Sequence, residues 1–474
     1  MQFFIFDTCF FYRFTHSKDL QQQLFKMEET VRFRRPLFYK LLYVYMSWLH
    51  RLYYRRLTIV GAEKIPADTP IIFAPNHQNA LMDALAVLFA ARQPVVFLAR
   101  ADIFKKPFVA KILNIVKMLP IYRIRDGYNS LERNQEVFDN TVGVLKSKIP
   151  LCILPEGNHE GLKRLRPLKK GIFRIAFQSE ESNSFNLNLH IIPVGLDYSN
   201  YFNPGSDLTI VFGTPIRIAD YADSYRENEQ KTINTLMKLL AENMRSVMIH
   251  IPEEHYALTY EISEMYAPNV WDTHNVKRQP FNSFTIKQYI IQKATEAFGQ
   301  DPEKAAELTA SLSEYNSKLK MFGLKDCFFQ DKQPCFLSIV IETLLTILLL
   351  PIHIYGFILN YLPYKIPVLI AAKIKDKHFQ SSIHFGIGVF MFPLYYLIVI
   401  SAFCMFADGI VPKLLFGLTL PITGFFAFYN YMHIKKLRLK LRFFMLKFTH
   451  PEQYKNLCTD RASIINQIKQ TINR

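Results

Sequence analysis

The residues best suited to chemistry lie in the stretch PNHQNALMDALAVLFAA, where His77 precedes an apolar run and Asp83 follows six positions later. The run predicts a helix that begins after Asn79, a good N-cap, and the helix dipole favours a carboxylate such as Asp83 in the first turns. From the preceding loop, the ring of His77 can turn one nitrogen toward Asp83 while the other removes a proton from a hydroxyl. Taken by itself, the stretch describes an Asn-capped helix with an incidental histidine at least as well.

Two more polar clusters follow predicted strands. In LPIYRIRDG, Arg123 and Arg125 stand two apart in an extended run and point to one face, where two guanidinium groups can bind a phosphate. In CILPEGNHEGLKRLRPLKKG, Glu156 and Gly157 follow a hydrophobic strand, where a glutamate can bind substrate hydroxyls. The basic residues behind them can meet a phosphate-rich ligand: Lys163, Arg164, Arg166, Lys169 and Lys170. The alternatives are a solvated basic edge for the arginines and an ordinary turn for the glutamate.

An α/β domain is expected to position these residues. Strands alternating with helices predict a largely parallel, buried sheet flanked by helices. Open sheets of this kind place their sites at strand ends, and the polar clusters fall directly after predicted strands. The last-but-one strand, IIPVGLDY, is interpreted as structural. The seven predicted strands lie between residues 57 and 215: LTIVG, IIFAPN, PVVFLAR, KMLPIYRI, PLCILPEG, HIIPVGLDY and LTIVFGTPI.

Composition divides the chain into four regions. Within the first, residues 31–56 interleave Arg and Lys with aromatic and leucine side chains. This pattern is typical of a helix lying in a membrane interface, although an amphipathic helix on the core is the alternative. In the third, Asp301-Pro302 predicts the start of a helix. The regions are an N-terminal segment with the interfacial helix (1–56), the α/β domain (57–215), a helical accessory region (216–334) and a membrane region with a basic C-terminal tail (335–474).

Three late apolar segments are long enough to be transmembrane candidates. They are CFLSIVIETLLTILLLPIHIYGFILNYLP, IHFGIGVFMFPLYYLIVISAFCMF and IVPKLLFGLTLPITGFFAFYNYM. The basic flanks YKIPVLIAAKIKDKHF and HIKKLRLKLRFF favour the cytoplasmic side, so the last two segments form a hairpin with the turn ADGIVPK outside. Pro351 breaks the first segment, and we expect two halves too short to span, which form a re-entrant or interfacial hairpin.

Net charge indicates the kind of ligand, and cysteine usage indicates the redox compartment. The formal charge of +17 attracts phosphates, whether of nucleic acid, anionic lipid or a small substrate. The six cysteines show neither a C-x-x-C pair nor a dense framework, so we expect free thiols in a reducing compartment and no zinc site. Near the N-terminus the basic residues follow the apolar run, which argues against a secretory signal, and Met27 is a possible start of translation.

The order of the motifs is more specific than any one of them. N-H followed by D, then YRIR, PEG and IIPVG, resembles the glycerolipid acyltransferase superfamily, which includes glycerol-3-phosphate and 1-acylglycerol-3-phosphate acyltransferases. The resemblance covers roughly residues 55–215. It implies a membrane-bound enzyme of phospholipid synthesis that moves a fatty acyl group from acyl-CoA or acyl carrier protein to a hydroxyl of glycerol 3-phosphate or 1-acylglycerol 3-phosphate.

The resemblance also implies roles for single residues. His77 is the general base and Asp83 orients it, Arg123 and Arg125 hold the acceptor phosphate, and Glu156 and Gly157 belong to the acceptor-binding block. A thioester is already activated, so a histidine base and donors for the oxyanion suffice without a metal, a cofactor or a protein nucleophile. The expected partners are the acyl donor, a phosphorylated glycerol lipid precursor and membrane lipid, with no nucleic acid. The catalytic domain is expected on the cytoplasmic face of the membrane.

Two departures from the family pattern matter. The common spacing is H-x-x-x-x-D, whereas five residues separate His77 from Asp83; a loop residue before the helix can absorb the difference. Asn158 and His159 replace Thr and Arg of the usual F-P-E-G-T-R-S block, which bears on acceptor specificity. Two other functions stay open: acylation of another lysolipid or an aminolipid, and a transport or scaffold role with a degenerate acyltransferase domain.

Overall fold

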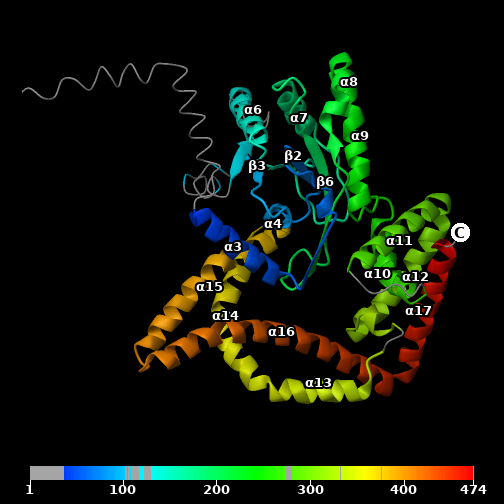
Figure 1. Cartoon of the computed structure of the whole chain (residues 1–474). Coiled ribbons are helices and arrows are strands. Elements are labelled where there is room, and N and C mark those ends of the chain that lie inside the picture. Colours follow the sequence, from blue (N-terminus) through cyan, green and yellow to red (C-terminus); the bar gives the residue numbers. More distant parts are fainter. Residues whose placement is uncertain are drawn as a thin grey trace, which may run out of the picture.

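A computed structural model describes residues 37–101, 104, 107, 113, 117–121, 130–273, 280–330, 333–374 and 376–472. These residues form an α/β domain, a helical bundle and a group of long apolar helices (Figure 1). The predicted fold class, an α/β domain with a largely parallel sheet and a C-terminal helical membrane region, is confirmed.

The α/β domain is built on a mixed sheet with the strand order β1–β7–β6–β2–β5–β3–β4, and β8 pairs with β6. Parallel pairing joins β1 to β7, β2 to β5 and β6, and β3 to β4 and β5, whereas β6 runs antiparallel to β7 and β8. Each of the seven runs predicted as strands contains one. The strands are β1 (Arg56–Val60), β2 (Ile71–Pro75), β3 (Val96–Arg100), β4 (Met118–Ile121), β5 (Leu151–Cys152), β6 (His190–Tyr198), β7 (Asp207–Phe212) and β8 (Ile216–Arg217).

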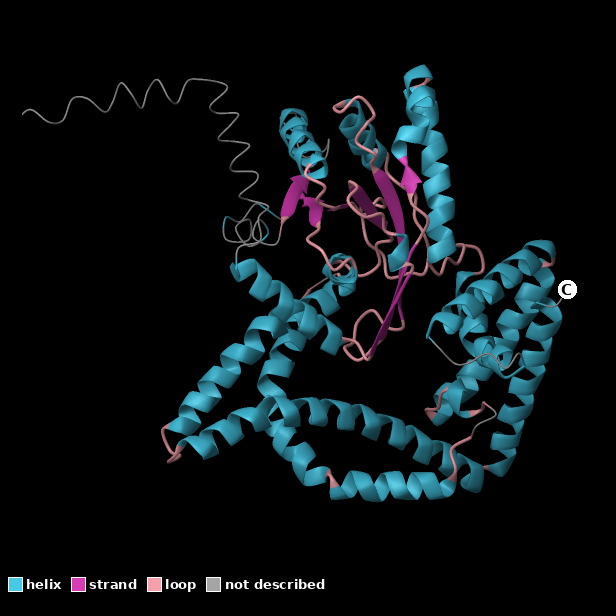
Figure 2. Ribbon diagram, in the orientation of Figure 1, coloured by secondary structure: helices cyan, strands magenta, loops and turns pink. Residues whose placement is uncertain are grey.

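Helices cover both faces of the sheet (Figure 2). In β2, Ile72 and Ala74 pack against α6 (Ser130–Lys146), α7 (Gly171–Glu181) and α9 (Glu229–Val247), which follows the short α8 (Ala222–Glu227). The alternate residues Ile71 and Phe73 pack on the other face against α4 (Leu81–Ala90) and α3 (Leu37–Tyr53). This alternation is what a strand buried on both faces requires.

A helical bundle joins two distant parts of the chain. It contains α10 (Tyr256–Thr273), α11 (Pro280–Gln300), α12 (Pro302–Phe322) and the C-terminal α17 (Pro451–Ile472). The predicted start of α12 is confirmed, because the side chain of Asp301 accepts a hydrogen bond from the N–H of Lys304 at 3.1 Å. Arg461 of α17 donates to Asp326 at 2.8 Å, which ties the C-terminal tail to the end of the accessory region.

The apolar helices are α13 (Phe336–Leu348), α14 (Leu350–Ala372), α15 (Gln380–Cys404) and α16 (Ile410–Thr449). Among the described residues, three helical segments are long and apolar enough to cross a membrane: Leu350–Ala372, Lys377–Cys404 and Ile410–Thr449. They indicate a membrane protein. The predicted hairpin of the last two segments is present as α15 and α16. The predicted break of the first segment is also present, between α13 and α14.

The expectation that both halves of the first segment are too short to span is wrong for α14. This helix has 23 residues, because it continues through YKIPVLIAA, a stretch that was predicted as a basic loop. Lys365 is the one charged residue in that stretch, and the apolar residues on either side extend the helix to Ala372.

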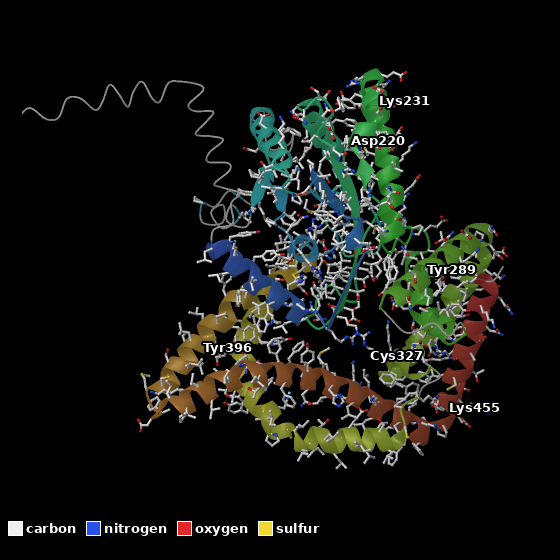
Figure 3. The ribbon with its side chains drawn as sticks, viewed as in Figure 1. Asp220, Lys231, Tyr289, Cys327, Tyr396 and Lys455 are labelled. Carbon is white, nitrogen blue, oxygen red and sulfur yellow. The ribbon has the colours of Figure 1, made fainter. Side chains whose placement is uncertain are left out.

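A buried asparagine connects α14, α15 and α16. The side-chain amide of Asn360 on α14 donates to the carbonyls of Gly356 and, across the interface, Leu420 of α16 at 3.2 Å. Its oxygen accepts from the hydroxyl of Tyr396 on α15 at 2.6 Å. Figure 3 labels Tyr396 among the side chains of the apolar helices. A Cβ at Gly356 would lie 2.2 Å from the carbonyl oxygen of Thr423, so glycine permits the close approach of α14 and α16. Small residues and satisfied polar groups are typical of helix contacts in membranes.

The N-terminal helix α3 leaves one apolar face exposed. Leu37, Leu41, Val44 and Trp48 recur at helical spacing, and each is at least 59% exposed. On another face of the same helix, the Tyr45 hydroxyl donates to the carbonyl of Val389 on α15 at 2.8 Å. An exposed apolar stripe beside a candidate membrane span fits the predicted helix in the membrane interface.

The glycine in IIPVG gives the first test of this fold. A Cβ at Gly195 of β6 would lie 1.6 Å from the carbonyl oxygen of Val247, so Gly195→Ala is expected to cost about 3 kcal/mol or more of unfolding free energy. Gly171→Ala is the control, because no described atom lies within 4 Å of its added Cβ. Thermal unfolding in detergent should show a large drop for the first variant and none for the second; equal melting temperatures would contradict the packing of α9 on β6.

Candidate active site

The ends of three neighbouring strands bring the candidate residues to one edge of the sheet. His77 follows β2, Glu156 follows β5 and Tyr198 ends β6, and both β5 and β6 run parallel to β2. The carboxyl ends of parallel strands meet at the same edge, where such sheets place their sites. Arg123 and Arg125, the predicted phosphate ligands, lie outside the described residues.

A buried carboxylate organises this edge. His77 Nδ1 lies 2.9 Å from Asp83 Oδ2, and the same oxygen accepts the backbone N–H groups of Gln78 at 2.8 Å and Asn79 at 2.7 Å. The other oxygen accepts the Tyr198 hydroxyl at 2.8 Å. A carboxylate can only accept, so Nδ1 of His77 carries the proton in this contact and Nε2 is left as the acceptor nitrogen.

Tyr198 was missed by the interpretation of IIPVGLDY as a purely structural strand. Its side chain is buried, and burial together with the nearby Asp83 raises its pKa well above the ordinary value, so it stays a donor. The available signal was a polar residue at the carboxyl end of a buried strand. Sequence alone could not show that this strand lies beside the one leading to His77.

The loop before α4 differs from the predicted capping arrangement. The helix begins at Leu81, after Ala80, whose φ of 44° and ψ of −121° lie in a region that L residues rarely adopt. Asn79 is therefore not the N-cap; its side-chain oxygen accepts the hydroxyl of Ser381 at 2.5 Å. The N–H of Leu81 donates instead to the hydroxyl of Ser382 at 3.1 Å. The turn at Ala80 absorbs the long spacing while His77 still reaches Asp83.

Glu156 connects the histidine loop to the following basic loop. Its two oxygens accept the backbone N–H groups of His77 at 2.8 Å and Arg166 at 3.1 Å, and the side chain is buried. Burial raises the pKa of Glu156 to about 7, and the two N–H donors oppose that rise. Gly157 follows with a φ of 69°, which suits glycine in this turn. These contacts hold the two loops together from inside the domain.

Two basic residues of the loop after Gly157 make contacts within the protein. Lys163, expected to meet a phosphate-rich ligand, is buried and donates to the side chain of Asp197 and to the carbonyl of Tyr198 at 3.2 Å. That expectation is wrong for Lys163, because a lysine without access to solvent is stable only with its charge paired. Arg164 pairs with Glu253 at 2.7 Å near the surface.

A second histidine lies beside the first. The ring of His159 is 5.2 Å from that of His77, and His159 Nε2 lies 3.0 Å from a carboxylate oxygen of Asp376. Burial and His77 lower the pKa of His159, while Asp376 opposes this shift. The ring of His378 is 6.0 Å from that of His159. Among the described residues, no group of three or more His, Cys, Asp or Glu side chains could hold a metal ion.

A known family model covers most of the α/β domain. The model of the Acyltransferase family matches residues 56–197, which contain His77, Asp83 and Glu156. The chain therefore contains a region, residues 56–197, that is similar to the Acyltransferase domain. The matched residues contain β1 to β5 in full and β6 up to Asp197, and the match ends one residue before Tyr198.

Named relatives are similar to this chain at low identity. Glycerol-3-phosphate O-acyltransferase 2 of Saccharomyces cerevisiae is 24% identical over 275 residues, which cover 56% of this chain and 35% of the relative. A chloroplastic 1-acyl-sn-glycerol-3-phosphate acyltransferase of Brassica napus is 24% identical over 40% of this chain and 51% of its own length. The chain thus spans about a third to a half of these relatives. The crystal structure of the 1-acyl-sn-glycerophosphate acyltransferase PlsC of Thermotoga maritima is similar with a TM-score of 0.33 and 17% identity, covering 50% of this chain and 92% of that one.

The conformation of Ala80 leads to a test of the helix start. Glycine adopts positive φ without a steric penalty, so Ala80→Gly should raise the unfolding free energy by about 1 kcal/mol. The same substitution at Ala84, inside α4, should lower it by about 1 kcal/mol. Thermal unfolding of both variants measures the contrast. A loss of stability in both would show that Ala80 does not hold this strained turn.

Proposed function

We propose that this protein transfers a fatty acyl group from a thioester donor, acyl-CoA or acyl carrier protein, to a hydroxyl of glycerol 3-phosphate or 1-acylglycerol 3-phosphate. The observation that carries the proposal is the contact of His77 with the buried Asp83 inside an Acyltransferase-family domain. The relatives named as glycerol-3-phosphate and 1-acyl-sn-glycerol-3-phosphate acyltransferases support this acceptor class.

In the proposed reaction, His77 acts as the general base. Its Nε2 accepts the proton of the acceptor hydroxyl as the hydroxyl oxygen attacks the thioester carbonyl, and Asp83 stabilises the imidazolium that forms. The tetrahedral intermediate then collapses: the carbon–sulfur bond breaks and the thiolate leaves with the proton from His77. An ester and a free thiol are the products, and no cofactor takes part.

The acceptor is proposed to bind beside His77. Arg123 and Arg125 are assigned its phosphate on the sequence pattern of the β4 end. Glu156 acts on the acceptor indirectly, because both of its oxygens already hold backbone N–H groups of the two loops that line this edge. Gly157 forms the turn that starts the acceptor-binding loop. His159, which stands where the family block usually has arginine, faces His77 and is therefore well placed to affect acceptor choice.

We also propose that the acyltransferase domain lies on the cytoplasmic face of the membrane. The segment between α14 and α15 contacts this domain through Asp376. After the turn near Asp408, α16 runs in the opposite direction to α15, and its C-terminal half is rich in Lys and Arg. If α15 and α16 both span, the domain and the C-terminus share one side, which the basic residues assign to the cytoplasm. Tags near Asp408 and at the C-terminus should label from opposite sides of sealed vesicles; labelling from the same side would refute this topology.

Thiol release by the purified full-length protein in detergent tests the reaction. With acyl-CoA, we expect release to depend on glycerol 3-phosphate or 1-acylglycerol 3-phosphate, and His77→Ala should reduce kcat by about 100-fold or more. His433→Ala, on α16, is the control and should keep its activity. Release that persists unchanged in His77→Ala would contradict the mechanism. Release with only a different lysolipid or an aminolipid would keep the chemistry and change the acceptor.

A further inference from the structure

The start of the second candidate span reaches the loop that carries His77. Two consecutive serines on α15 make the contact: Ser382 accepts the N–H of Leu81, the first residue of α4, and the hydroxyl of Ser381 donates to the side chain of Asn79. Both serines are buried. They come from a position more than 300 residues later in the chain than the loop they contact.

A second contact reaches the acceptor-binding loop from the same segment. Asp376 precedes the short helix η6 (Lys377–Phe379), and one of its oxygens accepts the N–H of His378 at 3.0 Å. Its other oxygen lies 3.0 Å from Nε2 of His159, whose ring packs edge-on against Phe379 at 4.8 Å. Asp376 thus contacts one ring nitrogen of His159, whose ring lies 5.2 Å from that of His77.

The geometry of α4 explains why an outside partner is needed. The first N–H groups of a helix have no partner within the helix, and a buried N–H without a partner costs about 1–3 kcal/mol. The turn at Ala80 removes Asn79 from the capping position, so the N–H of Leu81 depends on Ser382. Asp83 lies two residues farther along the same first turn. A change in the path of this turn therefore moves the carboxylate that orients His77.

We propose that Asp376, Ser381 and Ser382 are positioning residues, through which the membrane region completes the active site of the acyltransferase domain. This inference rests on the proposed function. Ser381 and Ser382 set the start of α4 and hence the contact between His77 and Asp83, and Asp376 sets the orientation of His159. A displacement of α15 would then also displace the groups that orient His77.

An anchoring role is the competing explanation, and the chain offers a matched control for it. The hydroxyl of Tyr45 on α3 also donates to α15, at the carbonyl of Val389. The helix α3 carries none of the reacting groups. Tyr45→Phe removes this contact and leaves the serines in place. Tyr396→Phe likewise removes a hydrogen bond within the membrane helices, to Asn360.

Steady-state kinetics of the full-length protein distinguish the two roles. Ser382→Ala and Asp376→Ala should lower kcat by roughly tenfold to hundredfold, because small displacements of reacting groups have effects of this size. The KM for acyl-CoA should stay within about twofold of the wild-type value, and Asp376→Glu should recover most of the lost kcat because it restores a carboxylate at a half-exposed position. Tyr45→Phe and Tyr396→Phe should keep kcat. Unchanged kcat in Ser382→Ala and Asp376→Ala, or equal losses in the tyrosine variants, would overturn the inference.

Hydrogen exchange separates this inference from the proposed function. Faster exchange of the amides at residues 78–83 is expected in Ser382→Ala and not in Tyr45→Phe, whether or not thiol is released. If the wild type releases no thiol with any acceptor, the proposed function fails, and the exchange result alone decides whether α15 sets the start of α4. Unchanged exchange in Ser382→Ala would overturn that dependence.

Discussion

The buried carboxylate of Asp83 is the constraint on which the site depends. A carboxylate buried away from water is stable only when its oxygens accept hydrogen bonds. Here the donors are the ring N–H of His77, two backbone N–H groups and the hydroxyl of Tyr198. Those donors come from the loop after β2 and from the end of β6. Both the path of this loop and the placement of β6 beside β2 are therefore needed to satisfy one side chain.

The side chains that hold the loops around this carboxylate are themselves polar and buried. The side chain of Asn76, directly after β2, donates to the carbonyl of Leu196 at 3.1 Å and accepts its N–H at 2.7 Å, which locks the loop onto β6. Glu156 makes the corresponding bridge to the loop after β5. Satisfied networks of this kind are rigid, because every broken contact leaves an unpaired group in a low-dielectric interior. A histidine held this way keeps one tautomer and one orientation without help from the substrate.

The helices of the membrane region are hydrogen-bonded directly to the candidate site. Asn360 joins α14, α15 and α16. The segment from Asp376 to Ser382 is hydrogen-bonded to the start of α4 and to His159. These contacts connect the apolar helices directly to the loops at the strand ends.

The sequence by itself determined the local features of this protein. The alternation of apolar runs, the polar residues directly after them, the helix start at Asp301 and the three apolar segments all depend on neighbouring residues, so periodicity and composition reveal them. The position of His77 and the expectation that Asp83 turns toward it came from the same local pattern, and the order of the motifs gave the family. Only the tertiary structure decided the partners: Tyr198 beneath Asp83, Ser382 in the capping position expected for Asn79, and α17 in the core of the accessory bundle. These contacts join residues that are more than a hundred positions apart or belong to different elements, and no local periodicity encodes which strand or helix end will lie beside another.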